Sequence, residues 1–314
     1  MRQQITWLGM ILAALGAGGA ARAQGGPESG ADLIRVTVTV SSTDKGAPPA
    51  LDKRDVMVRQ ENERRPVVDW VAAQDDRAAL DFALLVDDSL DTSLGSQLKD
   101  LQTFLRSLPA TARVGVAYSS HGSANWRQEF TTDRELAVKA LRMPMGSVND
   151  GSSIYMALAD LVKKWPKNGN RGAVLLISDG VDLFRGVSDS EAYEDQDLQA
   201  AIDLAQRNGV TLFTLFANGA ARYRSNFYLI GNGQGCLLRL ARETGGEAYF
   251  QGWQTPVAFK PFLEQAREKL SRQYVLTFRA HPGAKAGFVR LHVSTELPRV
   301  QITAPERVYV PAAQ

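Results

Sequence analysis

Four short, largely apolar runs in the middle of the chain constrain its fold most strongly. The runs span residues 82–86, 114–118, 173–177 and 210–216, and each is bounded by polar or turn-forming residues. Runs of this length are typical of parallel strands that are buried on both faces of a sheet. We therefore expect them to form strands of one mostly parallel sheet.

Helical patterns lie between these runs. The first has leucines at steps of four and three residues, which place them on one helix face: Leu94, Leu98, Leu101, Leu105 and Leu108. Further helices are expected over residues 154–165, 198–206, 237–242 and 257–270. Strands that alternate with helices predict an α/β fold with a doubly wound sheet and helices on both of its faces.

The two ends of the chain have a different pattern. Apolar residues alternate with polar ones over residues 34–40, and the alternation returns at 274–278 and 289–293, with a short apolar pair at 308–310. Each set of strands alone is too small for a stable sheet. We therefore expect one β-sandwich-like domain made from residues 32–72 and 273–312, with an α/β domain over residues 79–272 inserted between them.

The first 23 residues have the pattern of a secretory signal peptide. Arg2 precedes an apolar run over residues 5–20, and Ala21-Arg22-Ala23 forms an A-x-A cleavage site. This predicts an exported protein, periplasmic or secreted, that is cleaved near Ala23 and begins with a flexible leader over residues 24–31. The alternative is an uncleaved membrane anchor, although the run is barely long enough to span a bilayer.

Composition excludes several classes of protein. The chain has 36 Lys and Arg residues against 34 Asp and Glu, and Arg2 and Arg22 belong to the predicted signal peptide. The remaining charges balance, which argues against nucleic acid as a partner. One cysteine, Cys236, excludes an intrachain disulfide and a cysteine-based zinc site. No G-x-S-x-G or H-E-x-x-H motif is present, so we do not predict an enzyme.

Acidic and hydroxyl side chains follow the predicted strands at the point where each ends. Because the carboxyl ends of parallel strands lie at one edge of a sheet, these side chains are expected to be close together. Carboxylate and hydroxyl oxygens, with no imidazole or thiolate, suit a hard cation such as Mg²⁺, Mn²⁺ or Ca²⁺. The candidate metal-ligating residues are Asp87, Ser89, Asp91, Ser152 and Asp179.

This pattern resembles the von Willebrand factor A (VWA) domain. In that family a metal-ion-dependent adhesion site (MIDAS) combines a D-x-S-x-S motif after the first strand, a Thr in a later loop and an Asp-Gly turn. By position, Asp87 and Ser89 match the motif and Ser152 stands in place of the Thr, while Asp179 is followed by Gly180. The resemblance covers about residues 79–272. It implies a bound divalent cation, Mg²⁺ first, through which the domain holds an acidic side chain of a protein partner.

The ends of the chain resemble a narrower group, the exported VWFA-related Acidobacterial domain family. The segments Q-Y-V-L at residues 273–276 and R-V-Y-V at 307–310 carry this resemblance. Since no biochemical activity is assigned to that family, the resemblance supports the prediction of the fold more than that of the function.

Asp91 departs from the MIDAS pattern because it replaces the second Ser. Three ionised carboxylates, on Asp87, Asp91 and Asp179, would exceed the charge of a divalent cation. This predicts a metal that is held more tightly and recruits acidic ligands less well. Asp91 could also, or instead, cap the following helix. The remaining alternative is a degenerate, metal-free VWA domain.

Other candidate residues lie near the same edge. A polar segment after the run 210–216 suggests contact with a partner, through Arg222, Tyr223, Arg224 and Tyr228 together with His121, or else a self-packed loop. Acidic residues over 191–197 form either a second cation site or the start of a helix. The glycine-rich stretch 231–235 is expected to be a flexible loop. Cys236 is expected to open a helix and to be buried, with a reactive thiol as the alternative.

Together these observations predict an exported VWA-domain protein that binds an unidentified protein or surface through a modified MIDAS. The predicted cofactor is Mg²⁺, with Mn²⁺ or Ca²⁺ as alternatives. No membrane span is expected after the signal peptide. A metal-free structural module of an envelope assembly and a metal-assisted hydrolase are the alternative functions.

Overall fold

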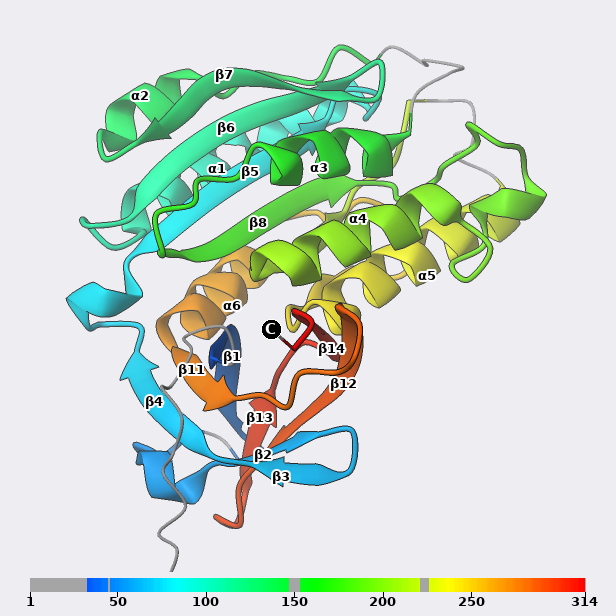
Figure 1. Ribbon diagram of the computed structural model, residues 1–314. Helices are drawn as coiled ribbons and strands as arrows, with labels where there is room; N and C mark the ends of the chain where they lie inside the picture. The colour runs from blue at the N-terminus through cyan, green and yellow to red at the C-terminus, as the bar shows by residue number, and fades with distance from the viewer. Residues whose placement is uncertain (1–32, 45, 147–152, 221–225, 314) are drawn as a thin grey trace, which may run out of the picture. The chain divides into compact units, whose positions relative to one another are not determined.

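The four apolar runs lie in neighbouring strands of one six-stranded sheet in the computed structural model (Figure 1), which describes residues 33–44, 46–146, 153–220 and 226–313. The strand order is β10-β9-β8-β5-β6-β7, and all pairs are parallel except β6 with β7. The strands are β5 (Leu80–Asp87), β6 (Arg113–Ser120), β7 (Ser123–Thr131), β8 (Arg171–Ser178), β9 (Val210–Phe216) and β10 (Ala248–Tyr249).

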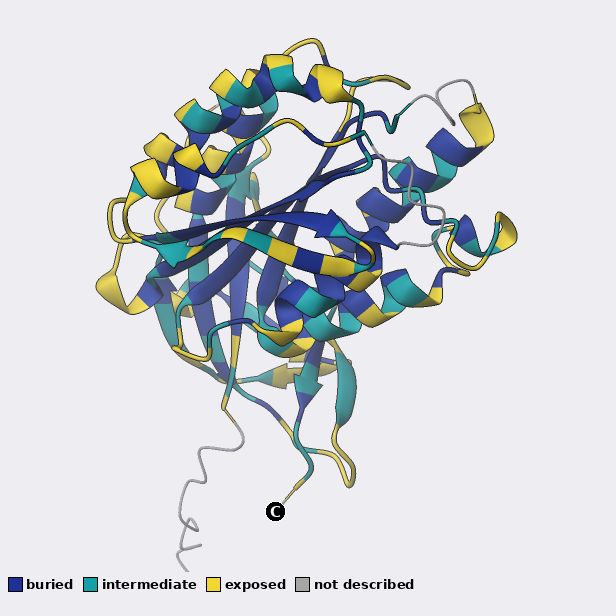
Figure 2. Cartoon of the chain, turned by 90° about the horizontal axis from the view of Figure 1, so that it is seen from above, coloured by how far each residue is buried: buried dark blue, intermediate teal, exposed yellow. Residues whose placement is uncertain are grey.

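Helices cover both faces of this sheet. On β5, Phe82 and Leu84 pack into one core with α1 (Leu98–Ser107), α2 (Arg134–Lys139) and α6 (Lys260–Ser271). The alternate residues Ala83 and Leu85 pack into the other core with α3 (Ile154–Lys163), α4 (Gln196–Asn208) and α5 (Phe227–Glu243). Every residue of β5 and β8 is buried, as Figure 2 shows for the strands between the helices. The predicted doubly wound α/β fold is confirmed.

The antiparallel edge strand β7 and the short helix α2 were not expected from the sequence. β7 alternates exposed and more buried residues, whereas β5, β8 and β9 are buried throughout. An edge strand packs with one face only, so it lacks the continuous apolar run that marks the inner strands. Asp133 starts α2 by accepting hydrogen bonds from the backbone N–H groups of Glu135 and Leu136.

Strands from both ends of the chain form two antiparallel sheets, in the orders β13-β1-β11-β4 and β14-β12-β2-β3. Both sheets contribute to one apolar core that includes Val38, Phe278 and Val293. The division of the chain into separate domains stays a prediction. The strands are β1 (Leu33–Ser42), β2 (Met57–Gln60), β3 (Glu63–Arg65), β4 (Val67–Ala72), β11 (Gln273–Arg279), β12 (Gly287–Ser294), β13 (Val300–Thr303) and β14 (Arg307–Val310).

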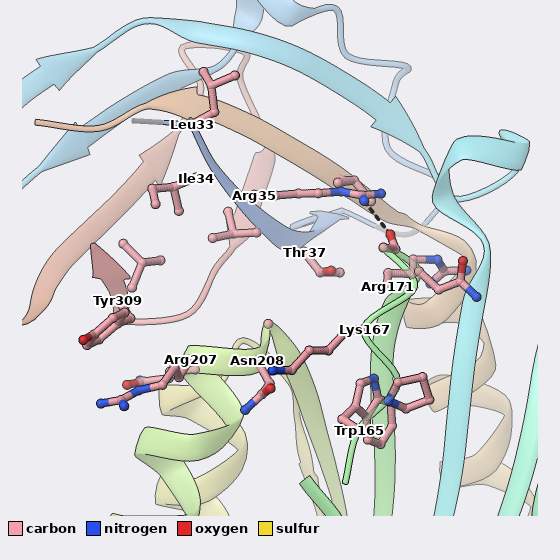
Figure 3. Close-up of a pocket in the computed structure, with 18 residues that line it drawn as sticks. Leu33, Ile34, Arg35, Thr37, Trp165, Lys167, Arg171, Arg207, Asn208 and Tyr309 are labelled. Atoms are coloured by element: carbon pink, nitrogen blue, oxygen red, sulfur yellow. Dashed lines mark hydrogen bonds between the residues drawn. The ribbon is translucent and has the colours of Figure 1, made fainter. Parts of the chain in front are cut away.

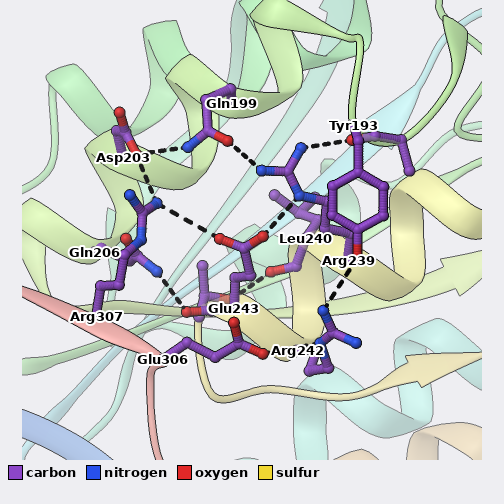
Figure 4. Close-up of polar contacts among 12 residues, drawn as sticks. Tyr193, Gln199, Asp203, Gln206, Arg239, Leu240, Arg242, Glu243, Glu306 and Arg307 are labelled. Atoms are coloured by element: carbon purple, nitrogen blue, oxygen red, sulfur yellow. Dashed lines mark hydrogen bonds and ion pairs between the residues drawn. The ribbon is translucent and has the colours of Figure 1, made fainter. Parts of the chain in front are cut away.

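Two arginines join these sheets to the α/β layers. Arg171, the first residue of β8, donates hydrogen bonds to the carbonyl oxygens of Ala78 (2.9 Å) and Leu270 (3.0 Å) and to Gln273 Oε1. Arg307, the first residue of β14, forms ion pairs with Asp203 of α4 at 2.9 Å and with the buried Glu243 of α5 at 3.5 Å (Figure 4). Arg239 holds the same Glu243 carboxylate at 2.6 Å.

Several predicted features lie outside the described residues. These are the signal peptide (1–23), the leader (24–31), and the site residues Ser152, Arg222, Tyr223 and Arg224. Among the residues that the structure describes, no helix combines the length and the apolar character that a membrane crossing requires.

The expectation for the glycine-rich stretch 231–235 is wrong. These residues lie inside α5, which begins at Phe227, ten residues before the predicted start. Cys236 therefore lies within a helix and does not open it, and it is fully buried, as expected. Its Sγ donates to the carbonyl oxygen of Ser190 at 3.4 Å, and burial raises the pKa of the thiol to about 12.

Replacing a buried leucine of the central strand should destabilise the protein strongly. We expect Leu84→Ala to lower the free energy of unfolding by about 2–5 kcal/mol, because it leaves a cavity between β5 and α1. The matched change Leu238→Ala, at a half-exposed position of α5, should alter it by no more than about 0.5 kcal/mol. Urea denaturation followed by circular dichroism measures both. Equal effects would contradict the burial of β5.

The thiol of Cys236 should be inert in the native protein. We expect no labelling by a maleimide near neutral pH, since the thiolate that reacts is suppressed by burial, and complete labelling in guanidinium chloride. Mass spectrometry reads this directly, because the chain has one cysteine. A second thiol at an exposed position, introduced by Ser96→Cys, should react at once. Rapid native labelling of Cys236 would contradict the packing of α5.

Candidate metal centre at the carboxyl edge of the sheet

Asp87, the last residue of β5, is surrounded by hydroxyl groups. Its Oδ1 accepts hydrogen bonds from the backbone N–H (3.0 Å) and Oγ (2.7 Å) of Ser89 and from Ser119 Oγ (3.3 Å). Its Oδ2 accepts from Ser178 Oγ at 2.8 Å. The carboxylate therefore lies among four donors from three strand ends, at the edge of the sheet where the sequence placed the site.

Ser119 is a contact that the sequence reasoning missed. It follows the apolar run 114–118 of β6 and donates to Asp87, while its Oγ accepts from the backbone N–H of Asp88 at 3.3 Å. A hydroxyl residue just after an apolar strand was the available signal. β5 and β6 are neighbours in the sheet, and their register places Asp87 beside Ser119. The sequence alone does not give this register.

Asp179 lies beside Asp87 and is also buried. It comes directly after β8, and its Oδ1 accepts a hydrogen bond from the backbone N–H of Val181 at 3.0 Å. Burial, followed by the nearby negative charge of Asp87, raises the pKa of the Asp179 carboxyl to about 7. The carboxyl groups of Asp87 and Asp179 are therefore close together, and the ionised form of Asp179 is disfavoured.

Neither carboxylate has a cationic partner among the described residues. The neighbouring Asp88 is different, because Arg142 binds it with two hydrogen bonds of 2.7 Å. Within the described part of the chain, Asp87 and Asp179 accept hydrogen bonds from hydroxyl and backbone N–H groups alone. Oxygen ligands with uncompensated negative charge suit a hard divalent cation, so the donor set fits such an ion.

Three glycines allow the backbone to approach Asp179 closely. A Cβ on Gly233 of α5 would lie 2.2 Å from the carbonyl oxygen of Asp179, and one on Gly219 would lie 2.2 Å from Asp179 Oδ2. Gly180 has a φ of +70°, and its Cβ would lie 2.4 Å from the carbonyl oxygen of Gly233. The glycine-rich stretch is therefore a packing surface of α5 against the Asp179 turn.

Asp91 caps the short 3-10 helix that precedes α1. Its carboxylate accepts a hydrogen bond from the backbone N–H of Ser93 at 2.9 Å, and its own N–H donates to the carbonyl oxygen of Asn218 at 3.1 Å. The capping alternative is thus observed, and a metal contact of Asp91 stays a prediction. Ser153, next to Ser152, caps α3 through the N–H groups of Tyr155 and Met156.

A second acidic cluster lies beyond the Asp179 turn. One carboxylate oxygen from each of Asp182, Asp195 and Asp197 lies within 4.8 Å of the others. Asp195 caps α4 by accepting from the N–H of Leu198, and Arg185 pairs with Asp197 at 3.1 Å. The predicted helix start is therefore present. Burial raises the pKa of Asp182, and it raises that of Asp195 to about 6.

Two residues of the predicted partner-binding set, Tyr228 and His121, are among the described residues, and they make different contacts. Tyr228, in the first turn of α5, is half-exposed and donates to Glu191 Oε1 at 2.6 Å. His121 forms the turn between β6 and β7 with a φ of +53°, and its Nδ1 lies 2.8 Å from Ser120 Oγ. Their contact with a partner stays a prediction.

Comparison with known proteins gives matches among solved structures alone. No family model matches the chain, and neither does any curated protein. An aerotolerance-related membrane protein from Bacteroides fragilis is 13% identical over 61% of this chain and 98% of its own, with a TM-score of 0.42. The VWA domain of SpRpn10 is 13% identical over 62% of this chain and 92% of its own, with a TM-score of 0.37.

The human COPII-coat protein Sec24c is 9% identical over 75% of this chain and 44% of its own, with a TM-score of 0.44. Sequence identities and TM-scores this low indicate a loose likeness in fold and say nothing about activity or partners. The strand order and the two helical layers described above are what give the chain the VWA-type α/β fold that the sequence resemblance implied. The narrower Acidobacterial family stays a prediction.

Proposed function

We propose that this chain is an exported binding protein whose VWA-type domain, over residues 79–272, holds a divalent cation and through it an acidic side chain of a protein partner. Asp87, Ser89 and Asp179 would hold the ion, with Ser152 as a further oxygen ligand. The β-domain from residues 32–72 and 273–312 would carry the binding domain. The proposed ion is Mg²⁺, with Mn²⁺ or Ca²⁺ as alternatives.

One observation carries this proposal: two buried carboxylates lie side by side without a cationic side chain among the described residues. Placing two such charges in a buried site is unfavourable unless a counter-charge is present. A divalent cation supplies that charge, and the hydroxyl groups of Ser89, Ser119 and Ser178 keep Asp87 in place for it.

The capping role of Asp91 bears on partner binding. Its Oδ1 accepts the N–H of Ser93. If Asp91 acts as a cap alone, the two acids that flank the ion, Asp87 and Asp179, balance a charge of +2. An ion balanced in this way attracts a further carboxylate more readily than one surrounded by three acids. The proposed partner group is therefore an Asp or Glu side chain.

Divalent cations should stabilise the native protein. We expect Mg²⁺ or Mn²⁺ to raise the melting temperature relative to EDTA, by the equivalent of about 2.7 kcal/mol when the ion is at a hundred times its dissociation constant. Differential scanning fluorimetry measures the shift, and isothermal titration calorimetry measures the affinity.

Asp179→Asn should abolish that shift while the protein remains folded, because the amide keeps the size of the side chain and removes its charge. Asp76→Asn, at an exposed position outside the site, should respond as the unchanged protein does. Loss of the shift in both variants, or a shift that persists in Asp179→Asn, would contradict the assignment. No shift with any of the three ions would favour the metal-free structural module.

The pH dependence of stability that Asp179 causes should disappear when metal saturates the site. Without metal, the native state binds more protons than the unfolded state between about pH 4, the ordinary pKa of Asp, and pH 7, the pKa of Asp179. Stability in EDTA should therefore fall as pH rises through this window. The affinity for Mg²⁺ should instead rise up to about pH 7, because binding releases the proton of Asp179.

Titration calorimetry in two buffers with different ionisation enthalpies counts the released protons. In Asp179→Asn this contribution to the pH dependence should disappear. Mg²⁺ affinity that is constant from pH 5 to pH 8 would contradict a role for Asp179 as a ligand.

A further inference from the structure

A cavity of about 500 Å³ lies at the amino ends of β8 and β9, opposite the edge that carries Asp87. Figure 3 shows β1 above it, the segment that leads into β8 beside it, and the end of α4 below it. Tyr309 of β14 closes a further side. This volume lies within the range of about 300–1,000 Å³ that is usual for ligand pockets.

Among the residues that the structure describes, the cavity is lined by no Asp or Glu and by four basic side chains: Arg35, Lys167, Arg171 and Arg207. Arg171 is buried and binds carbonyl and amide oxygens only, and burial lowers its pKa to about 10. Arg35 donates to the carbonyl oxygens of Gly169 and Arg77. Burial lowers the pKa of Arg35, and the negative charge of Asp69, which does not line the cavity, acts in the opposite direction.

The other two cations are exposed to the cavity mouth. Arg207 lies over the ring of Tyr309, with 4.2 Å from its guanidinium carbon to the ring centre. Neither it nor Lys167 forms an ion pair with any residue that the structure describes. Four cations therefore meet in one cavity, three of them (Lys167, Arg171 and Arg207) without a carboxylate partner among the described residues. This positive charge is complementary to an acidic ligand.

The first half of β1 forms one wall and has an open edge. β11 pairs with residues 33–39 of β1 on one side, whereas β13 pairs on the other side from Thr39 onward. The backbone N–H of Val40 points to β11, since it donates to the carbonyl oxygen of Arg272. Backbone groups alternate in direction along a strand, so those of Arg35 and Thr37 point away from β11, where no strand among the described residues pairs with them.

We propose that this cavity binds an extended, acidic segment of a partner protein, which adds to β1 as a further strand. The N–H and C=O groups of Arg35 and Thr37 pair with its backbone. Its Asp or Glu side chains contact Lys167 and Arg207, and its alternate side chains lie against apolar lining residues such as Val308. This site is separate from the proposed metal centre.

The first test uses a fluorescein-labelled nine-residue peptide in which Glu alternates with Thr, measured by fluorescence anisotropy with the full chain. We expect binding in the micromolar range, and none for the peptide with Lys in place of Glu. Lys167→Glu and Arg207→Glu should each weaken binding by about tenfold or more. Arg64→Glu, which changes an exposed cation of β3 outside the cavity, should leave it unchanged.

The second test asks whether the peptide binds as a strand. N-methylation of one amide at a time should weaken binding at every second residue, because alternate N–H groups face β1. A uniform effect along the peptide would overturn strand addition. Displacement by an equimolar amount of inorganic phosphate would assign the cavity to small anions, and equal binding of a single-stranded oligonucleotide would show unspecific polyanion binding.

The same titration separates this proposal from the metal centre. EDTA and the variant Asp179→Asn should leave peptide binding unchanged, whatever they do to the melting temperature. Peptide binding that requires Mg²⁺ or is lost in Asp179→Asn would place the peptide at the other edge of the sheet and would overturn the assignment.

Discussion

The central strand β5 carries a buried carboxylate near each end, and the two charges are compensated in different ways. Asp81, at the amino end, receives two hydrogen bonds of 2.7 Å from Arg113 and others from Asn168 and Asn170. Although burial acts to raise it, these donors hold the pKa of Asp81 below its ordinary value. Asp87, at the carboxyl end, has only neutral donors among the described residues. The first charge is compensated within the fold, and the second is the one for which we propose a cation.

The position of the second site depends on close backbone packing around the turn after β8. Gly233 brings α5 against the carbonyl oxygen of Asp179, and Gly219 leaves room for the carboxylate itself. A side chain at Gly233 would clash with the backbone of the turn, and one at Gly219 would displace the carboxylate of Asp179. Glycine weakens a helix by about 1 kcal/mol relative to alanine, so its presence in the middle of α5 is explained by this contact and not by local conformational preference.

The sequence predicted those parts of the molecule that a local pattern determines. The runs over 82–86 and 173–177 lie in β5 and β8 because full burial of a strand leaves a continuous apolar signature, and Asp87 and Asp179 follow at the same edge because parallel strands end together. Prediction failed where a contact distant in sequence decides the structure. The stretch 231–235 has the composition of a loop and becomes helical through its contact with Asp179, and Ser119 reaches Asp87 only through the register of β6.

The strand β8 connects the two proposed sites and keeps them independent. It begins at Arg171 and is followed by Asp179, and neither has an oppositely charged partner within the described part of the chain. At about 3.3 Å per residue its eight residues place the two ends more than about 20 Å apart. Two unit charges about 20 Å apart interact by only about 0.8 kcal/mol at an effective dielectric constant of about 20. An acidic ligand at one end therefore has little electrostatic effect on a cation at the other, and any coupling between the sites has to pass through the packing of the rigid sheet.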